Sequence, residues 1–253
     1  MLIKTLILFF FASKAYALSY EHIWHGYASV HIVIVDPKEH IIAPVKASPE
    51  MGRETVETLA KRYKARAAIN GGFWKSNGDP SGILKIDKVF LGLPTKPRGA
   101  IGWTSLEQKV CMDRILVDNS LEIIPMTNPP YTSAQEWQEC DHIVGGTPLL
   151  LQQGKVLDDY SFEQTIPTFL AHKHARTAVG IRSTGDWVFV VVDSFPLGGM
   201  NILELAHFLQ ELGCIQAVNL DGGSSSSLVI YGKLMNTPKH LYAEAVSDAI
   251  LIY

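Results

Sequence analysis

The sequence predicts a mixed α+β fold, with mixed β-sheet at its centre and two main helices packed on it. Three observations lead to this prediction. Short apolar runs rich in β-branched residues recur between turn residues, as expected of strands. Two other segments carry apolar residues at helical spacing behind cap residues. The order helix, strand, Asn, Gly-Gly occurs twice, which indicates a possible internal pseudo-repeat.

The first segment, residues 1–17, has the composition of a secretory signal peptide. Lys4 supplies a positive charge, Leu6–Ala12 is apolar, and Ala15-Tyr16-Ala17 has the small-x-small form of a cleavage site. The apolar run is too short to span a bilayer, although a retained anchor is an alternative. We expect a secreted or periplasmic protein, with residues 18–253 forming a single domain.

The next elements lead to a first Gly-Gly loop. Val30–Asp36 is predicted to be a strand that ends in an Asp-Pro turn. A helix is expected from Ser48-Pro49, a cap and first-position pair, to Tyr63. The short strand Ala67–Ile69 then runs into Asn70-Gly71-Gly72-Phe73-Trp74.

The same order returns near the C-terminus. Asn201 and Glu204 form a predicted capping box, and Gly213 ends the helix that follows. The strand Gln216–Val218 then leads into Asn219-Leu220-Asp221-Gly222-Gly223. Gly145-Gly146 opens a third loop of this kind, and we expect the three Gly-Gly loops to meet at one edge of the structure.

Further strands and turns fill the rest of the chain. Two Gly-Lys pairs are interpreted as hairpin turns, and the stretch Pro125–Gln138, rich in proline and polar residues, as a surface loop. The pairs are Gly154-Lys155 and Gly232-Lys233, and the strands are Ala100–Trp103, Arg114–Val117, Leu149–Gln152, Thr177–Arg182, Trp187–Val192, Ser227–Ile230 and Ala249–Ile252.

Charge and cysteine content limit the classes of partner. A formal charge of −3 with 19% charged residues gives no basic surface, which argues against nucleic acid. No later stretch is long and apolar enough to span a membrane. We therefore do not expect a membrane to be a partner of the protein once the signal peptide is removed. Cys214 is predicted to be a buried thiol. Whether Cys111 and Cys140 form a disulfide depends on geometry that sequence does not give.

The segment Asp221–Ser227 is the most specific candidate for chemistry. A carboxylate at a strand end precedes two glycines, which allow close approach of a ligand. Donor groups of Gly222, Gly223, Ser224, Ser225 and Ser226 suit an anion such as phosphate. The segment lacks the Gly-Lys-Ser/Thr ending of a P-loop and the Gly-x-Ser-x-Gly of a nucleophile elbow. A plain Ser/Gly turn capped by Asp221 is the alternative.

Three other positions could belong to the same site. In the first Gly-Gly loop, Asn70 could bind sugar hydroxyls, and Phe73 or Trp74 could stack on a sugar face or simply pack in the core. Arg176 could hold phosphate with two parallel hydrogen bonds. Asp193 ends an apolar strand and is either catalytic or a turn cap. His172 and His174 invite a zinc interpretation, but no third ligand is evident in the sequence.

Four of these segments, in this order, resemble the phosphodiester glycosidase family. They are Asn70-Gly-Gly-Phe73, Gly145-Gly146-Thr147-Pro148, Arg176-Thr177-Ala-Val-Gly180 and Asn219-Leu-Asp-Gly-Gly-Ser224. The resemblance runs from about Gly26 to Tyr253. It implies that Asn70, Arg176, Asn219 and the Asp221 loop line the site. Trp74 stands where a second Phe is usual in the family, and Ser224 where Gly is common.

The resemblance implies an exported hydrolase that cleaves between an anomeric carbon and a phosphodiester oxygen, acting on a sugar phosphodiester or phosphoglycan. Asp221, Arg176 and Asp193 are the predicted catalytic residues. The substrate-binding prediction comprises Asn70, Gly71, Gly72, Phe73, Gly146, Thr147, Thr177, Asn219, Gly222, Gly223, Ser224, Ser225 and Ser226. No cofactor is expected, although a divalent cation stays open. The alternatives are a metal-dependent phosphodiesterase that attacks phosphorus, and a non-catalytic protein that binds anionic glycans.

Overall fold

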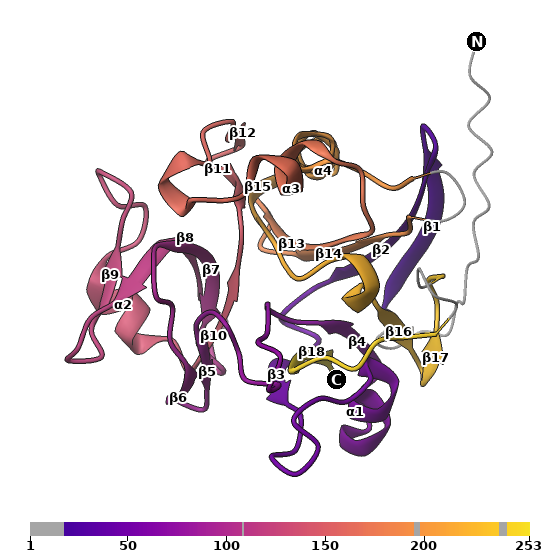
Figure 1. Cartoon of the computed structure of the whole chain (residues 1–253), viewed down its shortest axis with the longest axis horizontal. Helices are drawn as coiled ribbons and strands as arrows, with labels where there is room; N and C mark the ends of the chain where they lie inside the picture. Colours follow the sequence, from indigo (N-terminus) through magenta and orange to yellow (C-terminus); the bar gives the residue numbers. More distant parts are fainter. Residues whose placement is uncertain (1–17, 108, 195–197, 238–241) are drawn as a thin grey trace.

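The computed structural model describes residues 18–107, 109–194, 198–237 and 242–253. These residues form three sheets, four α-helices and two short 3-10 turns, Ser161–Glu163 and Gly223–Ser225. Strands dominate, which confirms the predicted α+β class (Figure 1). The predicted signal peptide lies outside the described residues. Within them, no helix has the length and apolar character needed to cross a membrane.

The largest sheet has seven strands, all paired antiparallel, in the order β1-β2-β14-β13-β15-β11-β12. Helix α4, Ile202–Glu211, packs on this sheet and contacts α3, Pro167–Ala171 (Figure 1). The predicted capping box of α4 is present, and Gly213 follows it at φ +82°, as expected of a helix stop. The strands are β1 Ser19–His25, β2 Ala28–Val35, β11 Leu149–Gln152, β12 Lys155–Val156, β13 Arg176–Arg182, β14 Trp187–Val192 and β15 Cys214–Asn219.

The second sheet has six strands in the order β6-β5-β10-β7-β8-β9 and lies at the left of Figure 1. Helix α2, Ala134–Glu139, packs its buried Trp137 against this sheet. The prediction of a loop over Pro125–Gln138 was therefore wrong at its end, because Ser133 and Glu136 form a capping box that starts α2. The strands are β5 Leu84–Ile86, β6 Val89–Gly92, β7 Arg98–Trp103, β8 Val110–Val117, β9 Ile123–Pro125 and β10 His142–Gly146.

The third sheet has five strands in the order β17-β16-β4-β18-β3, with α1 packed on it. Helix α1 spans Val56–Tyr63, so the predicted start at Ser48 was wrong. Gly52 has φ +65°, which interrupts helical geometry, and the Thr55 hydroxyl caps the helix instead. The strands are β3 Ile42–Lys46, β4 Ala67–Asn70, β16 Leu228–Ile230, β17 Lys233–Leu234 and β18 Asp248–Ile252.

A single hydrophobic cluster draws residues from all three sheets. Trp103 of β7 and Trp187 of β14 meet edge to face, with ring centroids 5.1 Å apart. The indole N–H of Trp103 donates to the carbonyl of Ile42 in β3 at 2.8 Å. Because the sheets share this core, the ends of β4, β10 and β15 are held at fixed positions relative to one another.

Candidate active site

The three Gly-Gly loops meet, although each lies at the end of a strand of a different sheet. The N–H of Asp221, after β15, donates to the carbonyl of Gly71, after β4, at 3.2 Å. The N–H of Thr147, after β10, donates to the carbonyl of Asn219 at 2.8 Å. The expected meeting of the loops is confirmed. The expected single edge was wrong, since the meeting point lies between three sheets.

Glycine is required at two of these positions because neighbouring atoms leave no space for a side chain. A Cβ on Gly71 would lie 1.9 Å from Oδ1 of Asp248. A Cβ on Gly146 would lie 2.3 Å from the carbonyl oxygen of Asn219. The absence of a side chain therefore lets the backbone of Gly71 pack against the Asp248 side chain, and the backbone of Gly146 pack against the backbone of Asn219.

The two predicted sugar-binding asparagines are buried, and their recorded hydrogen bonds go to the protein. Asn70 donates to the carbonyl of Asp221 at 2.7 Å, and its side-chain oxygen accepts from the Thr177 hydroxyl at 2.8 Å. Asn219 donates to the carbonyl of Thr147 at 2.7 Å. Asn70, Thr177 and Asn219 thus hold the loops together, and this geometry supports a positioning role rather than direct contact with a sugar.

Asp221 lies at the centre of this arrangement. The residue is partly exposed, and its Oδ1 accepts from the N–H of Gly222 at 2.9 Å. The pKa of Asp221 is raised to about 6, chiefly by burial and to a smaller extent by the charge of Glu244, while hydrogen bonds from Ser225 and Gly222 oppose the shift. A carboxylate that titrates near neutrality beside a solvent-accessible surface suits acid–base or nucleophilic chemistry.

A second carboxylate, Asp248, was missed in the sequence. It opens β18, is 1% exposed, and its Oδ1 accepts from the N–H of Gly72 at 2.8 Å. The pKa of Asp248 is raised to about 7, chiefly by burial and to a smaller extent by the charge of Asp221. The only sequence signal was an acidic residue at the start of an apolar strand, which is also typical of an ordinary strand end.

Arg176 is 1% exposed, and its recorded hydrogen bonds go to backbone carbonyls. Nε donates to Met200 at 3.0 Å, and Nη2 donates to Phe169 at 2.7 Å and His172 at 2.8 Å. The guanidinium lies 4.5 Å from the centre of the Phe169 ring, and burial lowers the pKa of Arg176 to about 10. These contacts position α3, so they favour a structural role over the predicted grip on phosphate.

Asp193 lies behind the Asp221 loop and is 3% exposed. Its Oδ2 accepts from the Ser29 hydroxyl and lies 3.0 Å from Nε2 of His31. Its Oδ1 accepts from Asn236, which in turn donates to the carbonyl of Ser226 at 3.0 Å. Asp193 therefore supports the loop from its protein side, and a catalytic role would require a path to substrate that these contacts do not provide.

The donors predicted to hold phosphate are largely used within the loop itself. The N–H of Gly222 donates to the Asp221 carboxylate, and that of Gly223 donates to the carbonyl of Ala175 at 2.8 Å. The N–H groups of Ser225 and Ser226 donate to the carbonyls of Gly222 and Gly223. Ser225 and Ser226 are also buried, which leaves Ser224 as the partly exposed serine of the predicted set.

A cleft of about 440 Å³ adjoins the loops and contains Phe73, Gly146 and Thr147 of the predicted set. Phe73 meets Phe169 edge to face, with ring centroids 6.1 Å apart. The cleft also contains three cationic side chains that sequence reasoning missed. The complete lining is Phe73, Lys75, Ser81, Gly82, Thr95, Lys96, Arg98, Gly145, Gly146, Thr147, Gln164, Thr165, Ile166 and Phe169. The local pattern Lys96-Pro97-Arg98 was the one signal available.

Comparison with known proteins gives a consistent result. The sequence model of the phosphodiester glycosidase family matches residues 63–253. An SPbeta prophage-derived uncharacterized protein, YomE of Bacillus subtilis, is 30% identical over 202 residues, which cover 79% of this chain and 30% of that protein. Human N-acetylglucosamine-1-phosphodiester alpha-N-acetylglucosaminidase is 26% identical over 200 residues, covering 74% of this chain and 36% of that protein. The chain spans about a third of the length of these relatives.

The fold has a counterpart among solved structures. The catalytic domain of zebrafish N-acetylglucosamine-1-phosphodiester alpha-N-acetylglucosaminidase, auto-inhibited by its pro-peptide, superposes with a TM-score of 0.73 at 24% identity. The match covers 94% of this chain and 82% of that one, so the three-sheet arrangement is similar to that domain along nearly its whole length.

Proposed function

The chain belongs to the phosphodiester glycosidase family, and from this premise we propose that it hydrolyses glycosyl phosphodiesters at the bond between the anomeric carbon and the phosphate oxygen. The observation that carries the proposal is the pair Asp221 and Asp248. Both carboxyls have a pKa raised towards neutrality, and both residues are hydrogen-bonded to the Gly71-Gly72 loop, Asp221 through its backbone N–H and Asp248 through its carboxylate. Two carboxyls in different environments are the usual equipment for cleavage of a glycosidic bond.

Asp221 is proposed as the group that acts at the sugar, because it is the partly exposed member of the pair. Its ionised form would attack the anomeric carbon directly or remove a proton from the attacking water. The departing phosphate is a stabilised anion, so the reaction needs less from a general acid than cleavage of an ordinary glycoside. Asp248, buried against Gly72, would position the loop and keep a proton next to Asp221.

Charge on the phosphate is proposed to be stabilised by Arg98 rather than by Arg176. Arg98 lines the cleft and immediately precedes Gly99, which pairs with Gly146 in the register of β7 and β10. Arg98 therefore lines the same cleft as Gly146 and Thr147 of the third loop. Arg176 would act indirectly, by fixing Phe169 in the cleft wall.

Hydrolysis in ¹⁸O-labelled water tests the position of bond cleavage. Label recovered in the released sugar supports attack at carbon and the proposed function. Label recovered in the phosphate monoester would overturn it in favour of a phosphodiesterase that attacks phosphorus. Binding of the substrate without any turnover would overturn it in favour of a glycan-binding protein.

We propose N-acetylglucosamine as the sugar, because human and zebrafish relatives are named for removing it from a 1-phosphodiester. A series of glycosyl 1-phosphodiesters that differ only in the sugar would test this, and a preference for another sugar would contradict it. Export to the envelope or the medium is proposed from the pattern of residues 1–17. N-terminal sequencing of protein recovered from outside the cytoplasm is expected to begin near Leu18.

A further inference from the structure

We infer that the cleft adjoining the Gly-Gly loops binds a second anionic group of the substrate, so that the preferred substrate is a multiply charged glycan phosphodiester. This inference rests on the proposed function and narrows its substrate class. Three observations support it: the positive charge of the cleft, the partners of the charged side chains, and the residues that form the cleft wall.

The cleft concentrates positive charge in a protein whose net charge is negative. Lys75, Lys96 and Arg98 line it, and no acidic residue is among its lining residues. The formal charge of the whole chain is −3. A phosphodiester carries one negative charge, and Arg98 is enough to match it. Lys75 and Lys96 then face the same cavity without an anionic partner, and a second anion on the substrate would provide one.

The buried carboxylate of Glu163 offsets part of the charge of Arg98, but it is also paired with Arg114. Glu163 is fully buried behind the cleft, where it forms an ion pair with Arg114 at 3.0 Å and accepts from the Thr147 hydroxyl at 2.8 Å. Arg98 donates to the backbone carbonyl of Glu163, not to its carboxylate. Burial lowers the pKa of Arg98, which means that its charge is poorly solvated, and a bound anion would offset that cost.

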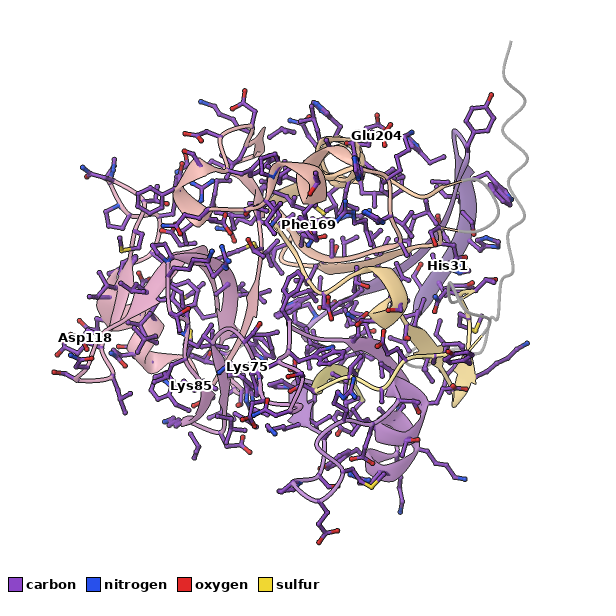
Figure 2. All side chains as sticks on the ribbon, viewed as in Figure 1. His31, Lys75, Lys85, Asp118, Phe169 and Glu204 are labelled. Carbon is purple, nitrogen blue, oxygen red and sulfur yellow. The ribbon has the colours of Figure 1, made fainter. Side chains whose placement is uncertain are left out.

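Neither lysine forms an ion pair within the described residues. Lys75 is exposed on the connection between β4 and β5, and Lys96 is half-buried just before β7. Lys75 and Phe169, both labelled in Figure 2, line the cleft from different elements, because Phe169 belongs to α3. Two flexible ammonium groups at the rim suit an anion whose position varies from one substrate to another.

The wall of the cleft offers apolar surface and hydroxyl groups to the aglycone of the substrate. Phe73, Ile166 and Phe169 form its apolar part, and Thr95 and Thr165 supply hydroxyl groups. A volume of about 440 Å³ lies within the range of cavities that enclose a small organic ligand, about 300–1,000 Å³. The cleft can therefore hold an aglycone as well as an anion, which fits a phosphorylated or carboxylated glycan.

The test compares two substrates that share N-acetylglucosamine 1-phosphodiester. One has a neutral methyl aglycone, and the other has an aglycone with a phosphate monoester or a carboxylate. Wild-type protein is expected to favour the doubly anionic substrate by about tenfold in kcat/KM, because each well-placed charged hydrogen bond contributes strongly to binding. The variant Lys75→Gln/Lys96→Gln is expected to lose that preference, and higher salt is expected to weaken it in the wild type.

Lys155→Gln/Lys233→Gln is the matched control, since both lysines are exposed at hairpin turns away from the cleft lining, and it should keep the preference. Equal kcat/KM for the two substrates in wild-type protein, or a preference unchanged in Lys75→Gln/Lys96→Gln, would overturn the inference. Binding of inorganic phosphate gives a readout that is independent of turnover. If no substrate is cleaved, the proposed function fails. Unchanged affinity for inorganic phosphate in Lys75→Gln/Lys96→Gln would separately overturn the inference of a second anion site.

Discussion

At the scale of single residues, the structure separates groups that hold the loops from groups that face the cleft. Asn70, Asn219 and Arg176 were predicted to touch substrate, yet their recorded bonds go to protein carbonyls and hydroxyls. Residue type indicated hydrogen-bonding capacity correctly. Sequence did not reveal which partner would use that capacity, because the partners lie far away along the chain.

Replacing Asp221 with Asn is expected to lower kcat by about 10²–10⁴-fold, the usual contribution of a catalytic acid or base. The amide oxygen can still accept from the N–H of Gly222, so the loop should keep its conformation. Steady-state kinetics and circular dichroism would measure both effects. Asp158→Asn, an exposed change outside the cleft lining, is the control. Full activity in Asp221→Asn would remove Asp221 from the mechanism.

Replacing Asp248 with Asn is expected to change how stability depends on pH. The folded state raises the pKa of Asp248 to about 7, so it binds this proton more tightly than the unfolded chain does. The stabilisation is complete below the unfolded pKa of about 4 and is lost as pH rises to about 7. Urea unfolding at several pH values should show a shallower decline in Asp248→Asn than in wild type. An identical slope would contradict the raised pKa.

At the scale of elements, short-range signals located many of the strands and one helix well, although β1, β3, β5, β6 and β9 were not predicted. β11 and β14 have the predicted bounds, and the capping box of α4 is present. The start of α1 and the existence of α2 were predicted wrongly. A positive φ at Gly52 moved the first helix start to Thr55, and the capping box at Ser133 was overlooked within a stretch rich in proline.

The contact between β8 and the end of α2 gives a prediction about Cys111 and Cys140. Both are free and buried, and Cys111 pairs in register with Gly102, whose Cβ position lies 2.9 Å from Sγ of Cys140. The hydrogen bond between the two thiols, together with burial, raises the pKa of Cys111. Because the thiols are already in contact, we expect oxidised glutathione to join them by exchange, with loss of two hydrogens in the protein mass.

The control for this cross-link is Cys140→Ala, which should show no loss of hydrogens under the same treatment. Cys214 lies in a separate hydrophobic cluster and is expected to stay a thiol in both proteins. Three titratable thiols in oxidised, denatured wild-type protein would show that the pair does not form a disulfide.

At the scale of the whole molecule, the shared core makes the three sheets depend on one another. Phe189 is 1% exposed and packs in the cluster that spans all of them. Phe189→Ala is expected to reduce the free energy of unfolding by about 3–5 kcal/mol, as for other buried aromatic side chains. Wild type and variant should each unfold in one transition by fluorescence and circular dichroism. Two separated transitions would contradict the predicted single domain.

The sequence by itself determined the balance of strands and helices, the three Gly-Gly loops and the family that the chain resembles. These features depend on local periodicity, capping and turn residues, which neighbouring residues specify. Only the tertiary structure decided that the loops meet between three sheets, that Asp248 joins Asp221, and that Lys75, Lys96 and Arg98 line one cleft. Those relations depend on burial and contacts between distant segments, which set both pKa and exposure and leave little pattern along the chain.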